Sequence, residues 1–244
     1  MSHFDVGPVL KDTIAVLEGK TAVLAVLALS IFGVGMILEL MLPGPTRIAM
    51  SQSEFQVISG TIWTGFVIDI LCYGLLTIVA TYAVYRHFQG GPTTIGDCIS
   101  GGVPMIPTVV GISVLSAIVI GVASLFLIVP GIYVYLVLWV ALPAALIENT
   151  GIVGGFKRSA ELTRNERWPV FIVTFILFIP IVAAGFLIDL MPFGGPPALI
   201  AYWVLTALSN LLLAVGTAVG YFHLRSGKSR LSIEEIVNPG GPPR

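Results

Sequence analysis

Six long apolar stretches, separated by short polar segments, run along the chain. They cover residues 21–43, 57–85, 107–129, 131–147, 169–191 and 197–222. A helix needs about 20 apolar residues to cross the ~30 Å hydrocarbon core of a bilayer, and each stretch meets or approaches that length. Pro130-Gly131 divides the third stretch from the fourth, because proline removes a backbone donor and glycine relaxes a turn. The pattern predicts an all-α membrane protein with six transmembrane helices, the third and fourth joined by a tight hairpin.

The segments that precede the first, third and fifth predicted spans are amphipathic. In the clearest of them, Ile152 and Phe156 share one helical face, whereas Lys157 and Arg164 lie on another. The other two segments lie within residues 4–18 and 95–99. This spacing is typical of short helices that lie in the membrane interface. We therefore expect three cytoplasmic interfacial helices.

The same order of elements occurs three times along the chain. Each predicted unit has an interfacial helix, an outward span and an inward span, over residues 4–86, 90–148 and 151–224. Residue identity between the units is thin, so the repeat is a hypothesis about architecture. The units form one predicted transmembrane domain over residues 1–225. Residues 226–244 are predicted to be a cytoplasmic tail, mostly disordered, in which Ser232 and Glu235 have the spacing that caps one helical turn.

Composition excludes a soluble protein. Hydrophobic residues make up 56% of the 244 residues and charged residues only 10%, whereas soluble domains carry about 25% charged residues. The net charge of −1 lacks the basic excess that nucleic-acid binding requires. The first apolar stretch is longer than the ~7–15 residues of a signal-peptide core, so we interpret it as a retained span.

The distribution of cations predicts the orientation. Of the twelve Lys and Arg residues, all but Arg47 fall in the N-terminal segment, in the second and fourth loops or in the tail. Cations stay on the cytoplasmic side, so both termini are predicted to be cytoplasmic. Trp168 begins the fifth predicted span, and Tyr221 and Phe222 end the sixth. These three aromatic residues are predicted to be anchors at the headgroup level.

One acidic residue lies deep within a predicted span. Asp69 is 12 residues into the second span, and Asn210, beside Ser209, is 13 residues into the sixth. A mid-bilayer acid costs roughly 2.5–3.5 kcal/mol, so it needs a reason. Two interpretations remain open. Asp69 and Asn210 could form an interhelical hydrogen bond worth ~0.6 kcal/mol, which we favour, or a proton-linked or substrate-binding site.

The sequence contains none of the common catalytic or metal-binding motifs. The three histidines lie near or beyond the predicted inner surface, and none has a second ligand at metal spacing. There is no nucleophile elbow, phosphate-binding glycine loop or His–acid cluster. The sequence therefore predicts a non-enzymatic protein without a cofactor.

A family resemblance rests on residues 129–168. The carrying segments are Val-Pro-Gly-Ile-Tyr-Val from Val129, Ala-Ala-Leu-Ile-Glu from Ala144, and Gly-Phe-Lys-Arg-Ser-Ala-Glu-Leu-Thr from Gly155. They resemble the bacterial YciC-like family, which is related to the glycerophosphodiester phosphodiesterase membrane domain. The resemblance implies a six-helix bacterial inner-membrane protein of poorly defined function. It implies no catalytic residue, because the phosphodiesterase chemistry belongs to a separate barrel domain.

The resemblance also matches Pro130 and Gly131 to the hairpin, and four residues to the motif of the third cytoplasmic loop. These four are Glu148, Arg158, Ser159 and Thr163.

The same loop permits two physical interpretations. Glu148 ends the fourth predicted span, where Arg158 or Arg164 could fold back and clamp the interfacial helix against the bundle. The cations of the loop could instead bind anionic lipid headgroups, at about 1 kcal/mol per charge. They are Lys157, Arg158, Arg164 and Arg167. We favour the clamp and keep both.

The predicted function is that of a scaffold, an accessory subunit or a lipid-associated factor in the inner membrane. The alternative is a small transporter or channel that uses Asp69 and Asn210. The predicted partners are membrane lipids, including anionic headgroups on the cytoplasmic side, and a membrane-protein partner or a second copy of the chain.

Overall fold

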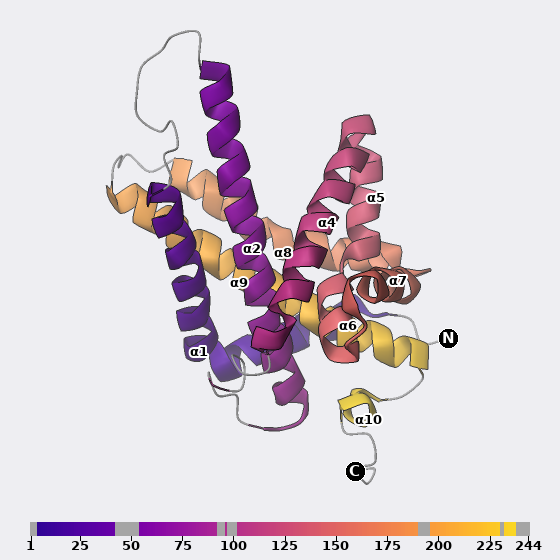
Figure 1. Cartoon of the computed structure of the whole chain (residues 1–244). Coiled ribbons are helices and arrows are strands. Elements are labelled where there is room, and N and C mark those ends of the chain that lie inside the picture. The colour runs from indigo at the N-terminus through magenta and orange to yellow at the C-terminus, as the bar shows by residue number, and fades with distance from the viewer. Residues whose placement is uncertain are drawn as a thin grey trace.

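The computed structural model describes residues 4–41, 54–91, 96, 102–189, 196–229 and 232–237, and all regular structure in these residues is helical (Figure 1). The elements are α1 (Val6–Met41), α2 (Glu54–Phe88), the 3₁₀ turn η1 (Val103–Met105), α4 (Ile106–Phe126), α5 (Ile128–Leu138), α6 (Ala141–Glu148), α7 (Gly151–Thr163), α8 (Arg167–Asp189), α9 (Pro196–Ser229) and α10 (Ile233–Val237). The all-α prediction is confirmed for this part of the chain.

Several of these helices are long and apolar enough to cross a membrane. Four helical segments qualify alone, namely Val67–Phe88, Val103–Leu125, Ile128–Glu148 and Ile200–Ser229. Two further pairs of helical segments qualify if each bent pair counts as one span. The described residues therefore provide four to six candidate spans, and the six predicted spans lie at the upper end of this range.

The two bends fall where amphipathic segments meet apolar ones. In α1 the axis turns by 89° between Val6–Gly19 and Ala22–Leu38, and α7 meets Arg167–Ala183 of α8 at 104°. A short helix at right angles to the following apolar helix has the geometry of an interfacial segment beside a span. These are the first and third predicted interfacial helices. The second, near residues 95–99, lies almost entirely outside the described residues.

The hairpin between α4 and α5 turns at Leu127, whose backbone is extended, with φ −169° and ψ 151°. The predicted turn at Pro130-Gly131 was therefore wrong by about three residues. Pro130 occupies the first turn of α5, where a missing amide proton has no helical partner to lose. Gly131 lets the two helices approach, since a Cβ added there would collide with Ser124 Oγ and lie 3.2 Å from Ser124 Cα.

Helix α9 is the central packing element, and it contacts α1, α2 and α8 (Figure 1). Tyr221 and Phe222 of α9 are fully buried, so the prediction that they are headgroup anchors was wrong. The cause is the length of α9, which continues to Ser229 and not to residue 222. Their side chains lie inside the bundle, about two turns before the end of the helix.

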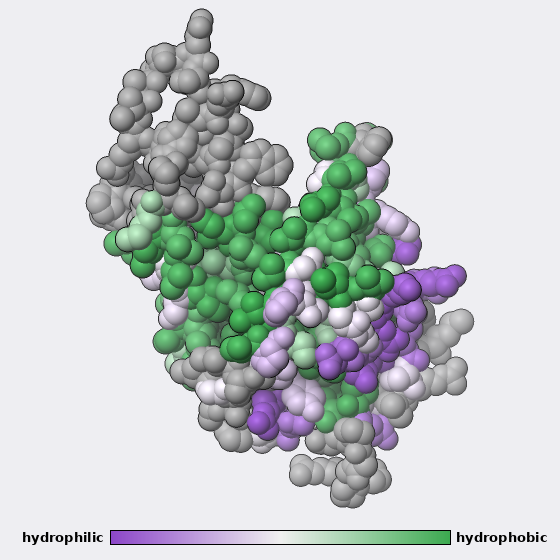
Figure 2. Space-filling model, viewed as in Figure 1, coloured by the Kyte–Doolittle hydropathy of each residue, from purple (hydrophilic) through white to green (hydrophobic). Residues whose placement is uncertain are grey.

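The molecular surface separates into apolar and hydrophilic regions (Figure 2). Hydrophobic residues cover the α4–α5 hairpin and the adjacent face, whereas hydrophilic residues gather near α7 and the nearby end of α9. Leu125 and Ile128 at the hairpin tip are 86% and 74% exposed. Soluble proteins rarely expose such continuous apolar surface, so this face fits hydrocarbon.

A short capped helix follows α9. The Ser232 amide donates to the Glu235 carboxylate at 2.7 Å, and the Glu235 amide donates to Ser232 Oγ at 3.2 Å, which confirms the predicted capping box. Tyr85 of α2 donates to the Val237 carbonyl at 3.4 Å. This part of the predicted tail is therefore docked on the bundle, and residues 238–244 lie outside the described residues.

Replacing Gly131 by alanine tests the close approach of α4 and α5. We expect Gly131→Ala to lower the free energy of unfolding by about 1–3 kcal/mol, because overpacking forces the helices apart. The loss should appear as a lower midpoint of thermal unfolding in detergent. Ser124→Gly should restore part of the loss. Gly121→Ala is the matched control, since its new Cβ meets no atom within 4 Å. Equal midpoints for the Gly131 and Gly121 variants would contradict the packing argument.

Candidate functional site

The candidate site is built around a break in the fourth apolar stretch. Helix α5 ends at Leu138 and α6 begins at Ala141, with Trp139 and Val140 in a turn between them. Pro143 explains the break, because it has no amide proton for the Trp139 carbonyl and its ring crowds that carbonyl. Such a break frees backbone polar groups, which an apolar environment leaves without water.

Ser159 of α7 satisfies the freed groups. Its hydroxyl donates to the Val137 carbonyl at 2.7 Å and accepts from the Val140 amide at 3.3 Å. Thr163, one turn later, donates to the Ser159 carbonyl at 2.9 Å. The side chains of Ser159 and Thr163 are fully buried. The two bonds of the Ser159 hydroxyl fasten α7 to the break between α5 and α6, whereas the Thr163 bond to the Ser159 carbonyl lies within α7.

A glycine brings α7 and α6 into backbone contact. A Cβ added to Gly155 would lie 2.8 Å from Ala145 Cβ and 2.9 Å from the Ala141 carbonyl oxygen. The absence of a side chain at Gly155 therefore allows Ser159, one turn further along α7, to reach the break.

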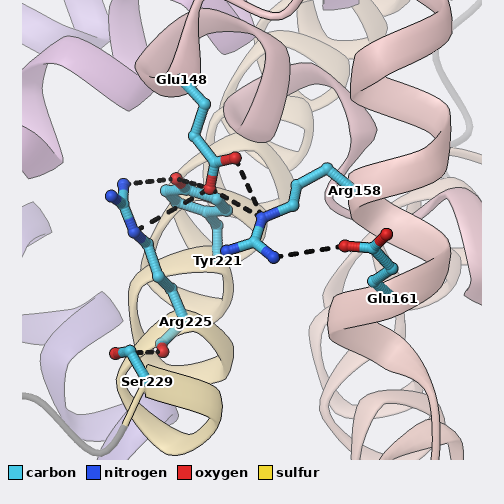
Figure 3. A network of polar contacts seen from close by, with 6 residues as sticks. All are labelled: Glu148, Arg158, Glu161, Tyr221, Arg225 and Ser229. Atoms are coloured by element: carbon cyan, nitrogen blue, oxygen red, sulfur yellow. Dashed lines mark hydrogen bonds and ion pairs between the residues drawn. The ribbon is translucent and has the colours of Figure 1, made fainter.

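Glu148 joins three helices at the end of α6 (Figure 3). Its carboxylate accepts from Arg158 Nε of α7 at 2.9 Å and from the Tyr221 hydroxyl of α9 at 3.0 Å. Arg225 Nε lies 3.9 Å from the same carboxylate, and Arg225 Nη1 donates to the Tyr221 hydroxyl at 2.8 Å. Arg158 also reaches Glu161 at 3.3 Å. One carboxylate thus links α6, α7 and α9.

The network is partly shielded from solvent. The Glu148 side chain is 16% exposed, and those of Arg158 and Arg225 are 32% and 28% exposed. Burial by itself lowers the pKa of the Arg158 guanidinium, but the hydrogen bond and the negative charge of Glu148 outweigh it, so this pKa lies above its usual value. Arg158 therefore stays charged at any physiological pH.

The same end of α9 makes two further links. His223 Nε2 lies 2.8 Å from Asp12 Oδ2, in the Val6–Gly19 segment of α1 that precedes the bend. Lys228 Nζ donates to the Arg164 carbonyl, just after α7, at 2.8 Å. The last turns of α9 thus connect both amphipathic segments to the bundle.

The remaining cations of the loop are placed differently. Lys157 and Arg164 have exposed side chains on α7 and the turn after it. Arg167, at the start of α8, donates from Nη1 to the Tyr133 hydroxyl of α5, and its Cζ lies 4.5 Å from the centroid of that ring. Of the four cations predicted to act together, only Arg158 therefore pairs with Glu148.

The structure does not bring Asp69 and Asn210 together. Asp69 is exposed on α2, and the Asn210 amide donates to the Thr206 carbonyl of its own helix at 2.9 Å. Ser209 is buried. Among the described residues, no hydrogen bond links these three side chains, because Asp69 points out of the bundle.

Tyr221 and Arg225 were missed by sequence reasoning. Both lie on one face of α9, four residues apart, near the predicted cytoplasmic level of Glu148. This shared depth was the available signal, and it was masked by the predicted role of Tyr221 as an anchor.

The fold and the site define a helical multi-pass membrane protein with a polar layer at one end. Over residues 94–225 the chain matches the model of a family described as a domain of unknown function (DUF7847). This match covers more than half of the chain, so the chain belongs to that family. No curated protein and no solved structure matches the chain. Within the described ranges, no cluster of three or more His, Cys, Asp or Glu residues could hold a metal ion.

Removal of the Ser159 hydroxyl tests the docking of α7 on the helix break. We expect Ser159→Ala to lower the free energy of unfolding in denaturant by about 1–3 kcal/mol, because it leaves buried backbone groups without partners. Ser229→Ala is the control, since that exposed hydroxyl bonds the carbonyl of Arg225 in its own helix. It should change stability by less than about 0.5 kcal/mol. Similar losses in both variants would refute the specific role of Ser159.

Neutralising Glu148 tests the three-helix link. We expect Glu148→Gln to destabilise the protein by about 1–3 kcal/mol and to increase hydrogen exchange in α7, because two guanidinium groups lose their shared anion. Glu161→Gln removes an outer partner of Arg158 that is 68% exposed, so it should have an effect below about 0.5 kcal/mol. Unchanged exchange in α7 of the Glu148 variant would show that the link is dispensable.

Proposed function

We propose that the chain is a non-enzymatic, lipid-associated membrane protein that holds a cationic amphipathic helix, α7, against the cytoplasmic surface of the cell membrane. The observation that carries the proposal is the placement of α7. It lies at 104° to α8, and Arg158 and Ser159 fasten it to the bundle. Lys157 is left exposed on its outer side, and Arg164 is exposed directly after it.

The exposed residues around α7 suit a headgroup layer. Each cation near an anionic surface contributes about 1 kcal/mol of attraction. Trp168, 74% exposed, follows the two cations in the chain, and amphipathic rings prefer this level of the membrane. Val153 is 63% exposed and adds apolar contact. Cations, an indole ring and an apolar side chain on a short helix and in the residues just after it are typical of an interfacial segment.

The proposed orientation places both termini in the cytoplasm. Any even number of crossings, including the six predicted spans, satisfies it, and the concentration of Lys and Arg away from Arg47 supports it. The bends in α1 and between α7 and α8 give the first and third units the same order of amphipathic arm, apolar helix and long return helix, which supports a repeated architecture. The bacterial inner membrane and the YciC-like relationship stay predictions from the resemblance.

The alternative role as a transporter or channel has less support. It requires a polar path shared by α2 and α9, but Asp69 is exposed on α2 and the amide of Asn210 bonds its own helix. The clamp and the lipid interpretation are compatible, because Arg158 serves the first while Lys157 and Arg164 serve the second.

Charge reversal on α7 tests the lipid association. The test is to purify the chain with native lipid in polymer-bounded nanodiscs and to measure the ratio of anionic to zwitterionic lipid. We expect the double variant Lys157→Glu and Arg164→Glu to lower this ratio severalfold, because roughly 1 kcal/mol is lost for each cation. Glu161→Lys, on the same outer face, should raise it. A ratio that is equal in all three proteins would overturn the proposal.

A further inference from the structure

An apolar groove of about 690 Å³ lies between α5 and α8. Tyr135 and Leu136 of α5 line it together with Phe171, Phe178 and Phe186 of α8. Phe178 and Phe186 are 45% and 65% exposed, so the groove opens to the outside of the bundle. Sites for small ligands commonly measure ~300–1,000 Å³ and are mostly apolar. The size and lining therefore fit a hydrocarbon chain.

The length of the groove agrees with one leaflet of a bilayer. Its lining on α8 extends from Phe171 to Phe186, which corresponds to about 22 Å at 1.5 Å per residue. Half of a ~30 Å hydrocarbon core is about 15 Å. One acyl chain of a single leaflet can therefore lie along α8 without leaving the groove.

One end of the groove is cationic. Arg167 lies one helical turn before Phe171, and Tyr133 is next to Ile132, which also lines the groove. The guanidinium of Arg167 donates to the Tyr133 hydroxyl and stacks over the Tyr133 ring at 4.5 Å. These contacts hold a positive charge where the apolar lining ends.

Arg167 differs from the neighbouring arginines in its partners. Arg158 and Arg225 share the carboxylate of Glu148, whereas Arg167 forms no ion pair with a carboxylate of the described residues. Its Nε is buried and has no hydrogen-bond acceptor among them. A buried donor without an acceptor is unfavourable, so this position favours an anionic oxygen. The positive end of the α8 dipole, at Arg167, acts in the same direction.

We propose that the groove between α5 and α8 binds one anionic phospholipid, with an acyl chain along the Phe171–Phe186 face and the phosphate at the Arg167 guanidinium. The proposal rests on the proposed function in one respect, because that function places Arg167 at the cytoplasmic headgroup level. It goes further by assigning a defined site and a stoichiometry of one lipid. The lipid attraction of α7 concerns the surrounding leaflet, whereas this lipid is held by the protein on two sides.

Retention of lipid after detergent washing tests the site. In this test the full chain is to be incubated with an equal mixture of phosphatidylglycerol and phosphatidylcholine and then washed. Retained lipids are to be counted by native mass spectrometry. We expect one phosphatidylglycerol per chain. Arg167→Gln should lower its occupancy about tenfold, because a charge-assisted contact is lost. Ala183→Trp, which fills the exposed groove without touching the charge, should lower it as well.

Three further variants separate the site from general effects. Tyr133→Phe removes the hydroxyl acceptor of Arg167 but keeps the ring, so retention should fall by less than in Arg167→Gln. Arg167→Lys keeps the charge and reports on folding if the glutamine variant unfolds, and it should retain more lipid than that variant. Lys11→Gln removes an exposed cation of α1 outside the groove and should leave the retained lipid unchanged.

The outcomes distinguish the two proposals. Retention that is unaffected by both Arg167→Gln and Ala183→Trp, or equal retention of phosphatidylcholine, would overturn the groove site. The nanodisc lipid ratio of the Lys157 and Arg164 double variant reports separately on α7. If that ratio falls while the groove variants retain lipid normally, the proposed function stands and the defined site fails.

Discussion

The arrangement of the polar end of the bundle depends on one carboxylate, that of Glu148. It accepts from Arg158 of α7 and Tyr221 of α9, and Arg225 lies within ion-pair distance. A partly buried anion is tolerated only where its lone pairs meet donors, and its removal would leave two guanidinium groups facing each other. Because Glu148 is also the last residue of α6, this single group fixes the end of α6 relative to α7 and α9.

The break between α5 and α6, at the other end of α6, also needs polar partners for its buried groups. Ser159 satisfies the backbone at Val137 and Val140, and Arg158, its neighbour in the chain, satisfies Glu148. Adjacent residues of α7 thus hold both ends of α6, and Gly155 permits the required approach. The amphipathic character of α7 therefore serves two surfaces, with Ser159 and Leu162 turned inward and Lys157 exposed.

Local patterns predicted the parts of this structure that depend on local physics. Hydropathy located the apolar helices, helical spacing located α7, and the Ser232–Glu235 spacing located a capped turn. The turn at Leu127 was misplaced because proline is tolerated in a first helical turn. The partners of Tyr221 and the outward position of Asp69 depend on how α9 and α2 rotate about their axes. Hydropathy carries little information on that rotation when helices are apolar all round.

Apolar helices in a bilayer gain little from hiding hydrophobic surface from one another, because lipid tails are equally apolar. Close backbone approach and polar links must then specify the arrangement, and both kinds of contact converge on α6 and α9. A Cβ on Gly220 of α9 would collide with the ring of Trp139 at the helix break, and Tyr221, the next residue, binds Glu148 at the other end of α6. Consecutive residues of α9 therefore contact both ends of α6, as consecutive residues of α7 do. A rotation of either helix would break a packing contact and a polar contact together, which is why one short helix can set the geometry of its two neighbours.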